Sequence, residues 1–350
     1  MHIDWQSDES HLLLNPRMPE EERRMLQSYV ADLPAHLWLA TSGTTGALKL
    51  TALSKKAMLA SAAAVNRHLD SDANDVWVNV LPTFHVGGLG IHARAFLSGA
   101  PVITAEWNPR QFAEQETMTL SSLVPAQVRD LVDQSMKPPQ TLRAIIVGGG
   151  ALEPSLYTQA RALGWPVLPS YGMTETCSQV ATATATLASP ELVLLDHVQA
   201  RTEEDGRLAF RGQSLLTGYG TASGFIDPKT EDGWFTTEDL GKVQNGRLQV
   251  GGRRGDFIKI GGESVDLARL DAILASIAGA HAAVLAVPDA RLGHVIHLAV
   301  TNATDPHTVK AAFDANVHPF ERARAVHVVA EIPRSPLGKL LRKQLLQIVE

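Results

Sequence analysis

Residues 41 to 49 combine hydroxyl groups, glycines and a lysine in nine consecutive positions. Glycine lets the backbone approach a phosphate closely, amide and hydroxyl groups donate to phosphate oxygens, and a lysine adds a positive charge. A kinase-type phosphate loop needs four residues between its first glycine and its Gly-Lys pair, whereas here only two separate Gly43 from Gly46. We predict a polyphosphate-binding loop. When this stretch is considered by itself, a turn that binds no ligand remains an open alternative. The predicted phosphate-binding residues are Thr41, Ser42, Gly43, Thr44, Thr45, Gly46 and Lys49.

Four further motifs follow in order along the chain. They are Tyr171-Gly-Met-Thr-Glu175, Gly233-Trp-Phe-Thr-Thr-Glu-Asp239, Gly252-Arg-Arg-Gly-Asp256 and Pro333-Arg-Ser-Pro-Leu-Gly-Lys339. In order and spacing, the five motifs together resemble those of the adenylate-forming superfamily, which comprises acyl-CoA synthetases, luciferases and the adenylation domains of peptide synthetases. Each motif alone is a weak signal, so the resemblance depends on all five.

The resemblance implies three catalytic residues. Thr174 is expected to donate a hydrogen bond to the α-phosphate of ATP, and Glu175 to hold Mg²⁺. Lys339 is expected to bridge the acid's carboxylate and the α-phosphate from a C-terminal loop. The alternative for Lys339 is one more solvated lysine beside Arg342 and Lys343.

Further residues match the nucleotide-binding positions of the family. Asp239 has two acceptor oxygens for the two ribose hydroxyls, and the positively charged guanidinium group of Arg253 can donate hydrogen bonds to the ribose or a phosphate. Without the resemblance, both would be interpreted as ordinary turn or hairpin residues. The remaining predicted nucleotide-binding residues are Gly149, Gly150, Ala151, Tyr171, Gly172 and Met173.

For the acyl group, the candidates lie after Pro82 and after Glu175. They are His85, Gly87, Gly88, Ser178 and Gln179. The segments that contain these residues are most similar to those of the o-succinylbenzoate-CoA ligase subfamily of menaquinone biosynthesis. The substrate of that subfamily carries an aromatic carboxylate besides the carboxylate that is activated. Polar donors in the pocket suit such a substrate. His85 is equally expected to be a packed gate or core residue.

The resemblance implies an ATP-dependent carboxylate-CoA ligase that uses Mg²⁺ and coenzyme A and releases AMP and pyrophosphate. Two alternatives stay open: a CoA ligase for another aryl or short acyl acid, and a truncated relative that binds nucleotide or adenylate without forming a thioester. The second predicts loss of Glu175, Asp239 or Lys339, and the sequence retains all three. A phosphotransferase would instead release ADP.

The elements that position these residues are indicated by hydrophobic periodicity. A helix is expected from Ser54 to about Leu69 and a strand near residues 76–80, and strands at 144–147 and 167–168 precede glycine-rich loops. After about residue 190, Asp205-Gly206, Asn245-Gly246 and Gly251-Gly252 are expected to punctuate short hairpin strands. We predict an α/β protein whose ligands lie at strand ends, with layered sheets and a β-rich end.

Residues 1–253 are expected to form the nucleotide- and acyl-binding domain. Residues 254–350 are expected to form a small mobile α+β domain that carries Lys339. Its expected elements are strands near 257–260, 282–287 and 294–300, a helix with Leu267, Leu270, Leu274 and Ile277, and then helix, strand and helix. By resemblance, this domain rotates between the two half-reactions about Gly255.

Composition excludes several classes of partner. A single cysteine, Cys177, rules out an internal disulfide, and acids at the N-terminus and the absence of a long apolar run argue against export or membrane insertion, so we expect a cytoplasmic protein. The net charge of -6, with acids and bases mixed along the chain, argues against nucleic acid.

The sequence departs from the family in three ways. The phosphate loop starts at residue 41, so we expect most of the family's usual N-terminal subdomain to be missing. Either the chain is then a compact variant, or a second copy covers the surface in a homo-oligomer. Leu48 replaces the usual proline before the loop lysine, and Glu238 replaces a common glycine and adds a negative charge near the nucleotide.

Overall fold

The computed structural model describes residues 3–42, 48–150, 152, 154–185, 189–253, 257–302, 305–333, 340 and 342–349. These residues form two compact units, 3–253 and 257–349. Both combine helices with sheets, and the layered α/β architecture confirms the predicted fold class.

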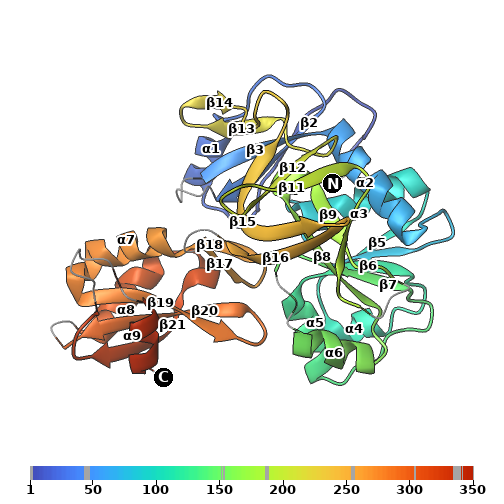
Figure 1. Ribbon diagram of the computed structural model, residues 1–350. Helices are drawn as coiled ribbons and strands as arrows, with labels where there is room; N and C mark the ends of the chain where they lie inside the picture. Colours follow the sequence, from blue (N-terminus) through green and yellow to red (C-terminus); the bar gives the residue numbers. More distant parts are fainter. Residues whose placement is uncertain are drawn as a thin grey trace. The chain divides into compact units, whose positions relative to one another are not determined.

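The described part of the larger unit contains two sheets (Figure 1). The smaller sheet has the strand order β1 (His11–Leu13), β2 (His36–Ser42), β3 (Leu48–Ser54), β13 (Gly218–Thr221) and β14 (Gly224–Ile226). The larger sheet has the order β11 (Val198–Thr202), β12 (Arg207–Gly212), β15 (Phe235–Gln244), β16 (Arg247–Arg253), β10 (Leu192–Leu194), β9 (Ser178–Thr182), β8 (Val167–Met173), β7 (Ala144–Val147), β6 (Leu120–Leu123), β4 (Trp77–Asn79) and β5 (Val102–Thr104).

Helices cover both faces of the parallel strands β4 to β8. On one face, residues of α2 (Lys55–Leu69) and α3 (Val86–Ser98) pack with Trp77, Ile146 and Leu168. On the other, residues of α4 (Pro109–Ala113), α5 (Pro125–Asp133) and α6 (Pro154–Ala162) pack with Val78 and Ile145. Two cores therefore sandwich this part of the sheet. A further helix, α1 (Glu20–Gln27), buries Leu26 against the smaller sheet.

Local sequence explains where α2 begins and ends. The Ser54 side chain accepts a hydrogen bond from the backbone N–H of Ala57 at 3.0 Å, as an N-cap does. Asp70 ends the helix in the left-handed conformation, with φ 49°. The predicted helix from Ser54 to Leu69 and the strands at 76–80 and 144–147 are confirmed within a residue or two.

Two of the turns predicted in the β-rich region, at Asn245-Gly246 and at Gly251-Gly252, have different outcomes. Asn245 and Gly246 have φ 51° and 71° and connect β15 to β16 in a two-residue turn, as predicted. The expectation of a turn at Gly251-Gly252 is wrong, because both residues lie inside β16 and Gly252 pairs with Leu240. The antiparallel partner strand satisfies this backbone, so the glycines need no turn.

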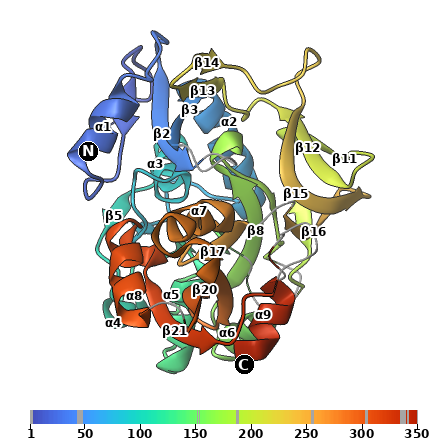
Figure 2. The same cartoon turned by 90° about the vertical axis from the view of Figure 1, so that its left-hand side faces the viewer.

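The smaller unit is one sheet with helices on both faces (Figure 2). In the described part, the order is β18 (Glu263–Asp266), β17 (Phe257–Ile260), β20 (Gly293–Thr301) and β19 (Ala282–Asp289), with β21 (Ala323–Val329) parallel to β20. Residues of α7 (Leu267–Ala278) and α8 (Pro306–Ala315) pack on one face and Leu345 of α9 (Arg342–Val349) on the other. Strand β18 was not predicted. Short 3₁₀ turns lie at Gly279–His281 and Pro319–Glu321.

Candidate active site

Strands β2 and β3 flank the predicted phosphate loop. They are antiparallel, with Thr41 opposite Lys49 and Ser42 opposite Leu48, so both ends of the predicted loop are strand residues. The Thr41 hydroxyl lies 2.9 Å from that of Thr51. The central loop residues Gly43, Thr44, Thr45 and Gly46 lie outside the described residues.

The Tyr171–Glu175 motif runs from β8 into a 3₁₀ turn, Thr174–Thr176, and the chain then reverses into β9. A Cβ atom at Gly172 would lie 1.8 Å from the Ser178 carbonyl oxygen, so only glycine fits there. Thr176 accepts a hydrogen bond from the Met173 N–H at 3.1 Å and donates one to the Ser178 carbonyl at 2.8 Å. This reversal places Thr174 and Glu175 directly before the buried residues Ser178 and Gln179.

Glu175 contacts a tyrosine that sequence analysis missed. The Tyr219 hydroxyl donates to Glu175 Oε1 at 2.9 Å. The Lys49 Nζ lies 3.2 Å from the centroid of the Tyr219 ring, in the geometry of a cation–π contact. The structure thus brings Lys49 and Glu175, from motifs far apart in the sequence, to the same side chain.

Asp239 forms a second cluster with predicted nucleotide-binding residues. The Tyr171 hydroxyl donates to Asp239 Oδ2 at 2.6 Å, and Asp239 lies opposite Arg253 in the β15–β16 register. The Arg253 side chain lies outside the description. Arg207 Nη1 lies 3.4 Å from Glu238 Oε1, so the extra acid beside Asp239 is offset by an arginine.

Two of the glycines predicted to bind the nucleotide follow β7, which pairs with β8 in parallel register, Val147 opposite Pro169. The loop at Gly149 and Gly150 therefore leaves the same sheet edge as the segment that begins at Ser170. Gly149 has φ 77°, which favours glycine. Ala151 lies outside the described residues.

Of the residues predicted for the acyl group, His85, Gly87 and Gly88 lie at the start of α3, whereas Ser178 and Gln179 lie in β9. His85 precedes α3, with its ring centroid 4.7 Å from that of Phe84. A Cβ atom at Gly88 would lie 2.4 Å from the Pro82 carbonyl oxygen and one at Gly87 would lie 3.3 Å from Leu81, so close packing accounts for both glycines.

Ser178 and Gln179 instead surround a buried arginine that sequence analysis did not single out. Arg94 of α3 is 1% exposed, and it donates from Nη2 to Ser178 Oγ at 3.2 Å and to Gln179 Oε1. Its Nη1 donates to Ser122 Oγ at 3.3 Å. The signal available in the sequence was an arginine within the run from Val86 to Leu97, where His92 is the only other polar side chain.

Within the described part of the chain, no carboxylate forms an ion pair with Arg94, and its buried Nε has no hydrogen-bond partner. Burial lowers the pKa of Arg94 to about 9, so the side chain is still a cation at neutral pH. A buried charge without a counter-ion is costly, and an anionic ligand would offset that cost.

Comparison with known proteins decides the family. The model of the AMP-binding enzyme family matches residues 35–220. A 2-succinylbenzoate–CoA ligase from Staphylococcus epidermidis is 30% identical over 321 residues, which cover 87% of this chain and 68% of that protein. The chain belongs to the AMP-binding enzyme family.

Solved structures agree with that assignment. The o-succinylbenzoate CoA synthetase of Bacillus subtilis bound with a product analogue has a TM-score of 0.78 at 27% identity, over 89% of this chain and 68% of the other. A malonyl-CoA ligase with methylmalonyl-CoA and AMP has a TM-score of 0.71 at 26% identity, over 85% and 71%. This AMP-binding enzyme is an AMP-forming acyl-CoA synthetase.

The expected co-substrates agree with the ligands of the relatives. Another structure of the Bacillus subtilis enzyme, 27% identical with a TM-score of 0.60, holds ATP and a magnesium ion. Mg²⁺ in such sites is bound by one or two carboxylates together with substrate phosphates. Glu175 fits this requirement, since Tyr219 occupies Oε1 and no hydrogen bond to Oε2 is present among the described residues.

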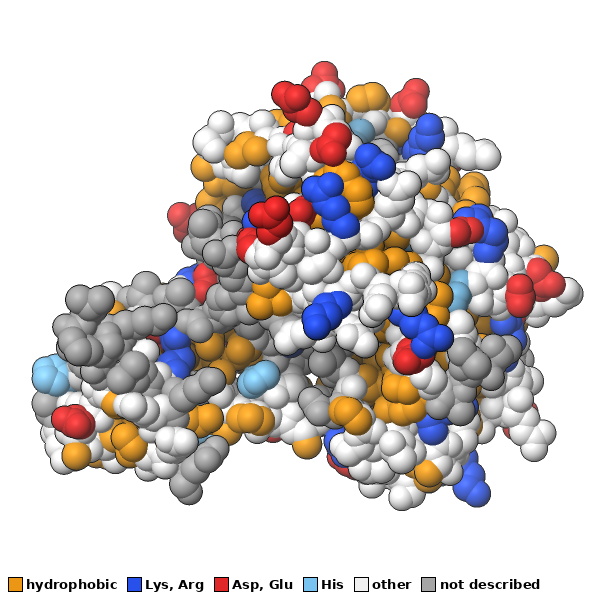
Figure 3. All heavy atoms as spheres, viewed as in Figure 1, with side chains coloured by type: hydrophobic (Ala, Val, Ile, Leu, Met, Phe, Trp, Pro, Cys, Tyr) orange, Lys and Arg blue, Asp and Glu red, His pale blue; other side chains and the backbone are white. Residues whose placement is uncertain are grey.

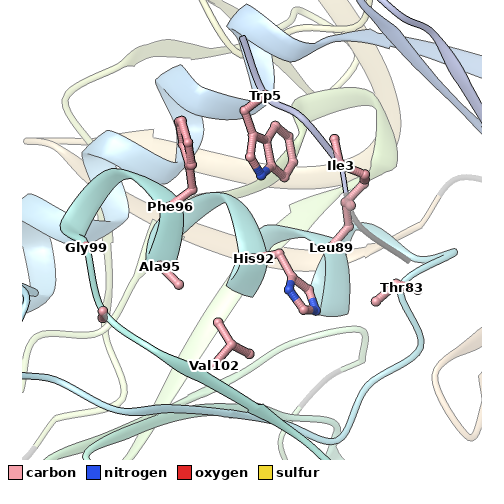
Figure 4. Close-up of a pocket in the computed structure, with 10 residues that line it drawn as sticks. Ile3, Trp5, Thr83, Leu89, His92, Ala95, Phe96, Gly99 and Val102 are labelled. Carbon is pink, nitrogen blue, oxygen red and sulfur yellow. The ribbon is translucent and has the colours of Figure 1, made fainter. Parts of the chain in front are cut away.

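A pocket of about 320 Å³ beside α3 is separate from these residues (Figure 4). Trp5, Leu89, Phe96 and Val102 contribute apolar lining, and His92 and Thr83 are polar. None of the predicted site residues lines it, although Arg94 belongs to the same helix.

Lys339 lies outside the described residues, so its predicted role stays a prediction. No described helix is long and apolar enough to cross a membrane. On the face shown in Figure 3, acidic and basic side chains are interspersed rather than gathered into a stripe of one sign.

Proposed function

We propose that this acyl-CoA synthetase activates o-succinylbenzoate, an aromatic acid with a second carboxylate, and transfers the acyl group to coenzyme A. One observation carries the proposal: the buried Arg94 cation lies against Ser178 and Gln179 and has no carboxylate partner among the described residues. The similarity to 2-succinylbenzoate–CoA ligases supports the same substrate.

Arginine suits this task because its planar fork matches a carboxylate in a bidentate fashion. Ser178 and Gln179 follow Glu175 within four residues, so chain continuity keeps the Arg94 site close to the predicted metal-binding residue. An added Cβ at Gly90 would lie 3.0 Å from Arg94 Nη2 and 3.7 Å from Ser178 Oγ, so glycine prevents crowding of the guanidinium. In the proposal, the aromatic carboxylate binds Arg94 and the succinyl carboxylate points toward the nucleotide.

The chemistry proceeds in two steps. A carboxylate oxygen of the acid attacks the α-phosphorus of ATP and pyrophosphate leaves; the sulfur of coenzyme A then attacks the acyl carbon and AMP leaves. Bound at Glu175, Mg²⁺ would neutralise phosphate charge. Asp239 accepts hydrogen bonds from the ribose hydroxyls, and Thr174 donates to the α-phosphate. Lys49 and Lys339 place positive charge beside the phosphates.

The test compares two acids that differ by one group. Thioester formation is measured by mass spectrometry with o-succinylbenzoate and with 4-oxo-4-phenylbutanoate, which lacks only the aromatic carboxylate, while the nucleotide product is identified as AMP or ADP. We expect kcat/KM to be about 100-fold higher for o-succinylbenzoate, since an unpaired buried charge costs about 2–5 kcal/mol. Arg94→Met should abolish the preference.

Arg94→Lys is the matched control, because it retains the charge without the fork and should retain part of the preference. An unchanged preference in Arg94→Met would contradict the role of Arg94. Thioester formation with another acid but not with o-succinylbenzoate would reject the substrate and leave the reaction class intact.

A further inference from the structure

The side chain of Tyr219 joins two groups of the proposed ATP site. Its hydroxyl donates to Glu175 Oε1 at 2.9 Å, and its ring face carries the Lys49 Nζ at 3.2 Å from the centroid. All three residues belong to the larger unit. Tyr219 is 9% exposed, so these contacts are shielded from water and stronger than they would be at the surface.

The backbone around Tyr219 is held tightly. Tyr219 pairs with Thr51 of β3, two residues after Lys49. A Cβ atom at Gly218 would lie 2.5 Å from the Phe225 ring, and one at Gly220 would lie 2.1 Å from the Tyr29 carbonyl oxygen. Strand β14 and the turn after α1 therefore approach so closely that glycine is needed on both sides of the tyrosine. The backbone from which the Tyr219 ring projects is thus fixed.

We infer that Tyr219 is a positioning residue for ATP and Mg²⁺: its hydroxyl orients Glu175 so that Oε2 can face the metal, and its ring holds the Lys49 ammonium beside the phosphates. The inference rests on the proposed function, because the roles of Glu175 and Lys49 belong to it. Tyr219 itself touches neither reacting atom in this scheme.

Each half of this role depends on a different part of the side chain. The phenol hydroxyl donates to Glu175 Oε1 and so fixes the orientation of the carboxylate, whose other oxygen can then face Mg²⁺. The electron-rich ring face attracts an ammonium group without neutralising it. Removal of the hydroxyl alone should therefore affect metal binding, whereas removal of the ring should affect the lysine as well.

The experiment measures binding of ATP by calorimetry over a range of Mg²⁺ concentrations, with the full-length protein. Tyr219→Phe should raise the Mg²⁺ concentration needed for half-maximal ATP affinity about tenfold, with unchanged ATP affinity in the absence of Mg²⁺. Tyr219→Leu should also weaken Mg²⁺-free ATP binding, about three- to tenfold, because Lys49 loses its support. Tyr157→Phe in α6 is the control variant and should match the wild type.

A double-variant cycle separates positioning from simple destabilisation. In the Glu175→Gln background, Tyr219→Phe should cause no further change in Mg²⁺ dependence, because the group that it orients is already altered. Thermal unfolding is recorded for every variant to verify that it folds.

The outcomes are distinguishable. The inference is overturned if Tyr219→Phe leaves the Mg²⁺ dependence unchanged, or if it has an equal effect in the wild-type and Glu175→Gln backgrounds. In either case, ATP binding by the wild type leaves the proposed function standing. If the wild type binds no ATP at any Mg²⁺ concentration, the proposed function fails and this inference fails with it.

Discussion

At the residue scale, the charged groups of the site are compensated in different ways. Asp239 and Glu175 each accept a hydrogen bond from a tyrosine hydroxyl. Arg94 donates to the neutral oxygens of Ser122, Ser178 and Gln179, and its guanidinium lies 5.5 Å from the centroid of the Trp77 ring. Because none of these described partners is a carboxylate, an anionic ligand suits the guanidinium.

Asp239 provides a prediction about the sugar. If it binds the ribose, Asp239→Asn should lower the affinity for ATP about tenfold, as expected for hydrogen bonds to a charged acceptor worth about 1.5–3 kcal/mol. The wild type should prefer ATP to 2′-deoxy-ATP, and the variant should lose much of this preference, as measured by calorimetry. Equal loss of affinity for both nucleotides would contradict ribose binding.

His197 provides a prediction about pH. Burial lowers the pKa of His197 from 6.5 to about 4, against an attraction from Asp196. The unfolded chain therefore binds a proton before the folded chain does, so stability falls as the pH drops from about 6.5 toward 4. At about 1.4 kcal/mol per tenfold change in proton affinity, the effect is at most about 3 kcal/mol.

His197→Gln removes this titration. The unfolding free energy of the wild type and of the variant is measured by urea denaturation at about pH 7.5 and about pH 5, on either side of the ordinary pKa of histidine. The difference between the two proteins should shift in favour of the variant at the lower pH. A difference that is independent of pH would show that His197 does not titrate in this window.

At the element scale, the β8–β9 reversal connects the residues predicted to bind the metal and the acyl group. Cys177 and Ser178 both have positive φ, 54° and 107°, and Gly172 allows the two strands to meet. Helix α3 contributes Arg94 to the same place from a distant part of the chain. The geometry of the predicted acyl site therefore depends on how closely β8 and β9 approach each other at this reversal.

Gly172→Ala should disrupt this closure. The added methyl group would lie 1.8 Å from the Ser178 carbonyl oxygen, and backbone shifts of this kind cost about 1–3 kcal/mol. We expect lower stability in urea and a raised KM for the acid.

Gly246→Ala is the matched control. It has positive φ but no atom within 4 Å of the added Cβ, so it should cost only about 1 kcal/mol and leave the KM unchanged. Equal effects of the two variants on the KM would contradict a special role for the reversal.

At the scale of the whole molecule, the predicted division of labour runs between residues 1–253 and 254–350. All the described site residues belong to the larger unit, and Lys339 belongs to the smaller one. If the smaller unit delivers Lys339 only for the first step, Lys339→Ala should slow adenylate formation by at least about 100-fold, the range of one electrostatic contact to a transition state.

The same variant should convert supplied acyl-adenylate into thioester at nearly the wild-type rate. Both half-reactions are followed separately, by release of pyrophosphate and by thioester formation. Lys310→Ala is the control, because Lys310 is paired with Asp314 within α8. Equal loss in both half-reactions would contradict the predicted role.

The sequence by itself indicated the class of fold, the helix after Ser54, the strands near 76–80, 144–147 and 167–168, and most elements of the smaller unit. It also supplied the candidate residues of the nucleotide site, whose roles stay predictions. These features are local: helix and strand periodicity, an Asn-Gly turn, and motifs whose order along the chain needs no knowledge of contacts. It failed at Gly251-Gly252, where a partner strand overrode the turn preference of glycine.

Only the tertiary structure decided which side chains meet. Arg94 lies 85 positions from Gln179, and Tyr219 lies 44 positions from Glu175. Periodicity indicates which face of an element is buried, but it carries no information on the partner across the core. The partners of the buried cation Arg94 and of Glu175, the acid predicted to bind the metal, are therefore visible only in the packed strands and helices.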